Sequence, residues 1–91
     1  MSGKIHCAHI LVKTEMEAKA ILERLNKGEK FANIAKQVSL CPSAKRGGDL
    51  GNFGRGVMVK EFETAAFALE KGETSGAIKT KFGYHIIRRL E

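Results

Sequence analysis

The chain has 91 residues, of which 43% are hydrophobic and 29% charged, the balance of a soluble globular protein rather than a disordered segment. Its length predicts a single domain over residues 1–91. No run approaches the roughly 20 apolar residues of a membrane span, and the start, Met1 to Lys4, lacks the apolar stretch of an export signal. A membrane-spanning protein, a secreted mini-protein and a disordered tail are therefore excluded.

The net charge is +6, from sixteen Lys and Arg residues against ten Asp and Glu residues. These positive residues are scattered, whereas a nucleic-acid-binding protein concentrates them in one region. We therefore expect a mildly basic, solvated surface and no nucleic-acid partner. A basic nucleic-acid-binding domain and contact with an anionic lipid surface stay open as lesser alternatives, should the fold gather the lysines on one side.

The two cysteines, Cys7 and Cys41, are too few for a disulfide-dense framework. Together with the missing export signal, they predict reduced thiols and a cytoplasmic location. A monomer is the expected oligomeric state.

The first half of the chain predicts one strand followed by two helices. Residues 4–13 are apolar at both alternating sets of positions, which indicates a central strand covered on both faces. Thr14 and Glu17 form a capping-box pattern, and Gly28 marks the end of the helix that follows. A second helix is predicted by the apolar stripe of Phe31, Ile34, Ala35 and Val38.

The second half predicts one more helix between short strands. Residues 39–46 contain Pro42 and can hold at most one helical turn, and five of the ten residues from Gly47 to Gly56 are glycine, so the chain bends sharply there. Strands are predicted over 49–53, 77–79 and 84–90. The helix between the first two ends at Lys71-Gly72, and its apolar stripe is Phe62, Ala65, Ala66 and Leu69. This order favours a small α+β domain with helices packed around one sheet.

Two histidines lie inside apolar strands. By alternation, His9 shares a face with Cys7 and His85 shares a face with Ile87. A histidine in such a position loses solvation unless its ring nitrogens find partners. If the first and last strands are neighbours, these two side chains can hydrogen-bond to each other, as a functional pair or simply as satisfied core residues. His6 falls on the opposite face and is expected at the surface or sheet edge.

Cys41 stands before Pro42 in a loop, where a thiol is more often accessible, and Lys45 and Arg46 nearby favour its thiolate. A cysteine hydrolase is disfavoured because the chain shows neither the larger scaffold nor the oxyanion hole of such enzymes. Zinc is disfavoured because no paired Cys-x-x-Cys spacing is present. Cys7, within the strand, is expected to be a small core residue.

The glycine-rich run lacks both the Gly-Lys-Ser/Thr ending of a phosphate-binding loop and a complete dinucleotide fingerprint. Leu50 within it and Met58 and Phe62 after it form either an apolar pocket with flexible walls or part of the core.

Four segments in order resemble the small stand-alone parvulin peptidyl-prolyl cis/trans isomerases. They cover almost the whole chain and are His6–Lys13, Phe31-Ala32 with Ala35-Lys36 and Ser39, Ser43–Gly51, and Phe82–Ile87. The resemblance implies a four-stranded antiparallel sheet flanked by about four helices in the order β-α-α-α-β-α-β-β, with the first and last strands adjacent at its centre.

The resemblance also implies the roles of eight residues. The catalytic set it implies is His9, Cys41, Thr80 and His85, and the substrate-binding set is Leu50, Met58, Phe62 and Phe82. Phe82 falls where the phospho-specific branch often has a serine. Lys60 departs from the family pattern, because many relatives have a proline two residues before the pocket phenylalanine.

The expected activity is rotation about X–Pro bonds in proline-containing polypeptides, assisting protein folding. The reaction makes and breaks no covalent bond, so no cofactor and no metal are expected. Phospho-dependent parvulins carry an arginine-rich insertion after the first strand, whereas this chain has only Lys13-Thr14-Glu15 there. We therefore expect broad specificity, favouring apolar or basic residues before proline. A non-catalytic proline-peptide-binding chaperone module is the alternative.

Overall fold

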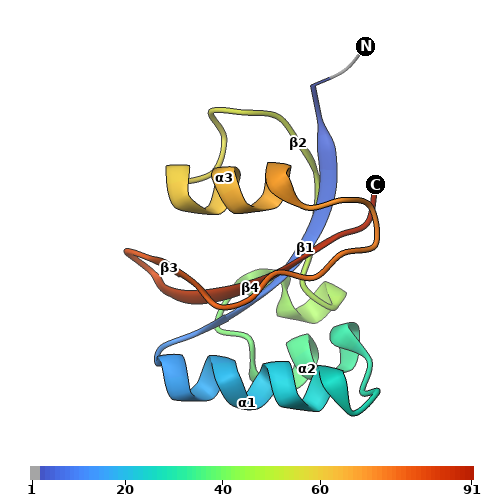
Figure 1. The fold of residues 1–91 in the computed structure, drawn as a ribbon, viewed down its shortest axis with the longest axis vertical. Helices are drawn as coiled ribbons and strands as arrows, with labels where there is room; N and C mark the ends of the chain where they lie inside the picture. Colours follow the sequence, from blue (N-terminus) through green and yellow to red (C-terminus); the bar gives the residue numbers. More distant parts are fainter. Residues whose placement is uncertain (1–2) are drawn as a thin grey trace.

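A computed structural model describes residues 3–91. The prediction about an export signal rests partly on Met1 and Ser2, which lie outside the described residues. Its elements, in the order that the sequence predicts, are drawn in Figure 1. They are β1 (Ile5–Val12), α1 (Glu15–Asn26), α2 (Phe31–Val38), the 3-10 helix η1 (Pro42–Arg46), β2 (Asp49–Phe53), α3 (Lys60–Ala68), β3 (Ile78–Thr80) and β4 (Gly83–Arg89). The fourth helix that the family resemblance implies is thus the single 3-10 turn η1.

The four strands form one antiparallel sheet in the order β2-β1-β4-β3. The first and last strands therefore lie side by side at its centre, paired from Cys7↔Arg89 to Val12↔Tyr84. This confirms the prediction from the two apolar faces of residues 4–13, because only a central strand is covered on both sides.

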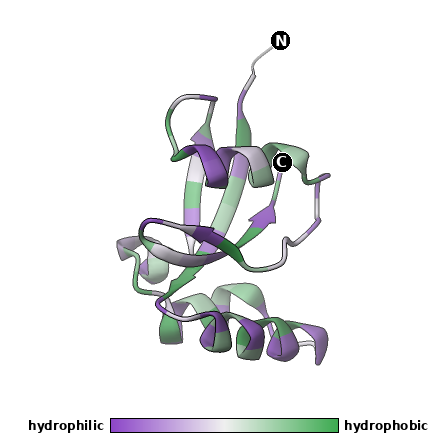
Figure 2. Cartoon of the chain, turned by 60° about the vertical axis from the view of Figure 1, so that its left-hand side comes forward, coloured by the Kyte–Doolittle hydropathy of each residue, from purple (hydrophilic) through white to green (hydrophobic). Residues whose placement is uncertain are grey.

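Helices cover both faces of the sheet, with α1 and α2 on one side and α3 on the other (Figure 1). The core accordingly divides in two. Ile10, Ile34 and Ile86 lie at the centre of the half under α1 and α2, and Cys7, Phe62 and Ile87 lie in the half under α3. Hydrophobic and hydrophilic segments alternate along the helices in Figure 2, as expected where one side of a helix is buried.

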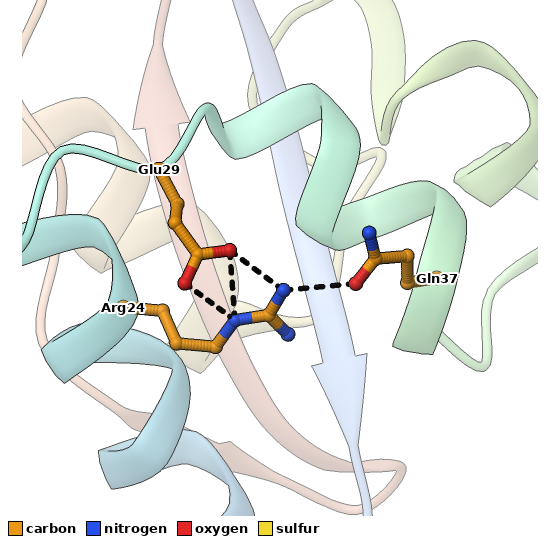
Figure 3. A network of polar contacts seen from close by, with 3 residues as sticks. All are labelled: Arg24, Glu29 and Gln37. Carbon is orange, nitrogen blue, oxygen red and sulfur yellow. Dashed lines mark hydrogen bonds and ion pairs between the residues drawn. The ribbon is translucent and has the colours of Figure 1, made fainter.

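Helix α1 begins and ends where the sequence predicts. The Thr14 hydroxyl accepts a hydrogen bond from the Glu17 N–H, and the Glu17 carboxylate accepts one from the Thr14 N–H, which completes the capping box. In its last turn, Arg24 donates to the Glu29 carboxylate at 2.7 Å and to the Gln37 side-chain oxygen at 2.8 Å (Figure 3). This network ties the end of α1 to the linker and to α2.

Helix α3 is shorter than predicted. The apolar stripe indicated an end at Lys71-Gly72, but the helix ends at Ala68, because Leu69 is extended (φ −76°, ψ 146°). Residues 70–73 form a separate turn, in which the Glu70 N–H donates to the Glu73 carboxylate at 2.7 Å. This turn uses backbone groups that a longer α3 would need, and the apolar periodicity of the sequence does not reveal it.

The turn between η1 and β2 lies directly on β1. Gly47 and Gly48 have φ of +70° and +87°, and a Cβ at Gly48 would come within 2.3 Å of the His9 carbonyl oxygen. The His9 N–H in turn donates to the Gly48 carbonyl at 2.9 Å. The sharp bend predicted from the glycines is confirmed, and it brings η1 and the segment before it against the centre of the sheet.

No helix within residues 3–91 combines the length and the apolar character that crossing a bilayer requires.

Candidate active site

An apolar cavity of about 450 Å³ opens on the α3 side of the sheet. It brings together seven of the eight residues predicted for the site, namely His9, Cys41, Leu50, Met58, Phe62, Phe82 and His85. These residues come from both central strands, the segment before η1, β2, the loop before α3, α3 itself and the β3–β4 turn. The eighth, Thr80, is buried behind the cavity and contacts His85.

The two histidines form a hydrogen-bonded pair, as their strands allow. In the β1–β4 register His9 pairs with Ile87 and Leu11 with His85, so the histidines are diagonal neighbours on the α3 face. The two Nδ1 atoms lie 2.9 Å apart, and the imidazole rings stack with their centroids 5.1 Å apart. The sequence predicted this hydrogen bond on the condition that the first and last strands are neighbours, and both the pairing and the contact are present.

Thr80 extends this pair into a buried chain of polar contacts. Its Oγ1 lies 2.7 Å from His85 Nε2 and accepts a hydrogen bond from the Phe82 N–H at 3.1 Å. A neutral imidazole carries one N–H, so the proton between Thr80 and His85 and the proton between the histidines must point in the same direction along the chain. In both arrangements His9 Nε2 has no hydrogen-bond partner among the described residues.

Both imidazoles are neutral at pH 7. Burial, and secondarily the neighbouring His85, lower the pKa of His9 to about 4, and burial also lowers the pKa of His85. Phe62 stands edge-on to both rings, with centroids 5.5 Å from His9 and 5.2 Å from His85. The aromatic ring keeps water from the pair and forms part of the cavity wall.

Cys41 lies at the edge of the cavity, partly accessible, just before η1. Its backbone is extended (φ −81°, ψ 144°), as a residue before proline requires. The segment is held on β1 by two hydrogen bonds, from the Leu40 N–H to the Leu11 carbonyl at 2.8 Å and from the Leu11 N–H to the Ser39 hydroxyl at 3.1 Å. Cys41 is therefore accessible but fixed in position.

The remaining candidates of the sequence lie away from the cavity. Cys7 is fully buried in the core, and burial raises the pKa of its thiol to about 11. His6 lies where β1 pairs with the edge strand β2, and its Nε2 is 2.7 Å from Asp49 Oδ1. Among residues 3–91 no three His, Cys, Asp or Glu side chains gather closely enough to hold a metal ion.

Sequence reasoning missed the outer wall of the cavity. Leu40 and Val57 line it with 56% and 66% of their surfaces exposed, and Leu11, Pro42 and Val59 lie beside them. Leu40 and Val57 are large apolar side chains in loops, outside any helical or strand periodicity. That mismatch was the one signal in the sequence that pointed to them.

Comparisons with known proteins identify the family of this chain. The family model of the PPIC-type PPIase domain, a rotamase, matches residues 9–91. Foldase protein PrsA 4 of Bacillus cereus is 56% identical over 86 residues, which cover 93% of this chain and 31% of the foldase. The chain thus spans less than a third of the length of that curated relative.

Two solved structures match along nearly their whole length. NmPin, the parvulin of Nitrosopumilus maritimus, has a TM-score of 0.89 and 54% identity, covering 100% of this chain and 99% of its own. Pin from the psychrophilic archaeon Cenarcheaum symbiosum has a TM-score of 0.86 and 58% identity, covering 100% and 95%. The chain belongs to the parvulin family, the PPIC-type peptidyl-prolyl cis/trans isomerases, which confirms the resemblance found in its sequence.

Proposed function

We propose that this chain accelerates cis/trans rotation about X–Pro bonds in polypeptides and thereby assists their folding. The observation that carries the proposal is the apolar cavity whose base is a neutral, hydrogen-bonded histidine pair. Amide resonance gives the uncatalysed rotation a barrier of about 20 kcal/mol. A site that holds the proline ring in dry surroundings favours the twisted amide, which has lost this resonance and much of its charge separation.

Each predicted residue has a proposed role in this reaction. Leu50, Met58 and Phe62 hold the proline ring, and Cys41 lies beside the rotating carbonyl without forming a bond to it. His9 and His85, with Thr80 behind them, fix the hydrogen bonding at the base of the cavity. No step requires a cofactor, because no bond is made or broken.

We propose that the substrates are unfolded segments with apolar residues next to proline. Of the five large hydrophobic side chains exposed within residues 3–91, three line the cavity: Leu40, Val57 and Phe82. None of the described lining residues is Asp, Glu, Lys or Arg. An apolar side chain before proline therefore gains contacts there that a charged one does not.

A phosphorylated side chain is not expected to be preferred. The connection between β1 and α1 consists of Lys13 and Thr14, and it offers no arginine that could form the bidentate contacts phosphate favours. We further propose that the chain is a monomer. We also propose a reducing, cytoplasmic environment, because both cysteines are free thiols.

A panel of proline peptides tests the proposal. The cis-to-trans rate is measured with and without the chain for Ala-Leu-Pro-Phe, Ala-Glu-Pro-Phe, an Ala-Pro peptide and a phosphoserine-proline peptide. We expect the leucine peptide to give the highest kcat/KM and the phosphoserine peptide to be slower than an Ala-Pro peptide. Turnover of the phosphoserine peptide at or above the Ala-Pro rate contradicts the proposed specificity. Binding of all peptides by folded protein without acceleration leaves a binding module in place of an enzyme.

A further inference from the structure

The loop between β2 and α3, residues 54–59, supplies one wall of the cavity through Val57, Met58 and Val59. It contains two glycines and consists of turns and bends, without helix or strand. A loop of this kind moves easily unless side chains hold it in place. The position of the cavity wall therefore depends on what anchors the loop.

Glu63 on α3 provides that anchor. Its Oε1 accepts a hydrogen bond from the Gly56 N–H at 2.6 Å, and its Oε2 accepts one from Arg55 Nη1 at 3.3 Å. Only 17% of the Glu63 side chain is exposed, against 65% for Arg55. Gly56 has a φ of +88°, which allows the chain to turn its N–H toward the carboxylate.

A second contact secures the same loop one helical turn further on. The Arg55 guanidinium lies over the Phe67 ring, 4.3 Å from its centroid. Phe67 in turn packs edge-on against Phe53, the last residue of β2. Arg55 and Gly56 are thus both held by the helix that also carries Phe62 into the cavity.

From these contacts we infer that Glu63 is a positioning residue, which fixes the wall formed by Val57 and Met58 at a set distance from Phe62. It acts on substrate binding through the loop and does not touch the substrate. This inference rests on the proposed isomerase function for its kinetic consequence, but not for its structural one. The short hydrogen bond to the Gly56 N–H carries more of the effect than the exposed pair with Arg55.

Four variants separate these contributions. Glu63→Ala and Glu63→Asp remove or shorten the acceptor, and Glu63→Gln keeps an oxygen for the Gly56 N–H while losing the charge. Glu61→Ala is the matched control, because it removes a carboxylate from the first turn of the same helix at an exposed position with no side-chain partner among the described residues. Glu63→Asp keeps the charge near the helix N-terminus and guards against a general loss of helix stability.

Two readouts are taken for each folded variant, the KM and kcat for Ala-Leu-Pro-Phe and the hydrogen-exchange rate of the Gly56 amide. We expect Glu63→Ala and Glu63→Asp to raise KM about fivefold or more with kcat within twofold, and to speed Gly56 exchange about tenfold or more. Glu63→Gln and Glu61→Ala stay within twofold of the parent in both. Unchanged Gly56 exchange in folded Glu63→Ala and Glu63→Asp overturns the inference, whereas absence of any parent activity overturns only the proposed function.

Discussion

His9 and His85 are held in the protonation state that burial dictates. Removing an imidazolium from water is costly, so both rings are neutral in the folded protein. The one N–H proton that each neutral ring carries is available for the hydrogen bonds that link His9, His85 and Thr80. The stability of the fold is thereby coupled to pH, because the unfolded chain protonates the same histidines more readily.

We expect the free energy of unfolding to fall between pH 6.5 and about 4. In this range an unfolded His9 takes up a proton near its ordinary pKa of 6.5, whereas the folded one does so only near a pKa of about 4. The unfolded state therefore binds more protons, and His9 alone accounts for at most roughly 3 kcal/mol of loss. Urea unfolding of the parent and of His9→Asn at pH 7, 5.5 and 4.5 measures it. An identical pH slope in the two proteins contradicts the argument.

Cys41→Ser tests the role of the thiol. A hydroxyl retains the size and polarity of the group beside the proposed carbonyl position but is a far poorer nucleophile at neutral pH. We expect the variant to keep about a tenth or more of the parent kcat/KM, measured with Ala-Leu-Pro-Phe. Complete loss of activity in a folded variant argues for a direct chemical step at sulfur.

At the level of single elements, the sequence was informative wherever a local pattern decides the structure. The capping box of Thr14 and Glu17 and the two apolar faces of residues 4–13 depend on neighbours in the chain, and both predictions are confirmed. The early end of α3 and the loop contact of Glu63 depend on groups that meet only in the folded chain. For this reason neither left a pattern in the sequence.

The start of α3 offers a stabilising substitution. Lys60 is the first residue of the helix, where a backbone N–H has no helical partner, and Val59 before it is already extended (φ −60°, ψ 151°), as proline requires of its predecessor. We expect Lys60→Pro to raise the free energy of unfolding by about 0.4–1 kcal/mol, because proline restricts the unfolded chain. Urea denaturation measures the change. A decrease would show that the Lys60 N–H or side chain is needed.

The turn on β1 is tested by a pair of glycines with positive φ. Gly51→Ala puts its Cβ into open space, so we expect only the backbone cost of about 1–2 kcal/mol. Gly48→Ala adds a clash with the His9 carbonyl oxygen and is expected to cost clearly more than Gly51→Ala in urea unfolding. Equal losses for the two variants would mean that the close approach to β1 is not held in solution.

At the scale of the whole molecule, the site exists only when the sheet is closed. His9 comes from the first strand and His85 from the last, and the sheet order places them together. Residue patterns alone singled out six of the seven predicted lining residues, and the family resemblance added Phe82 and assigned the roles, because the family motif keeps residues that are far apart in the chain. Neither revealed Leu40 and Val57, since the rim arises from loops whose meeting depends on the complete fold.

The central claim is that this cavity catalyses rotation about the X–Pro bond and does not merely bind proline peptides. Two-dimensional exchange NMR of Ala-Leu-Pro-Phe with a small amount of the chain measures both properties in one sample. The account predicts exchange cross-peaks between the cis and trans forms, together with shift changes at the amides of the residues that line the cavity. Shift changes at these amides without exchange cross-peaks would contradict it.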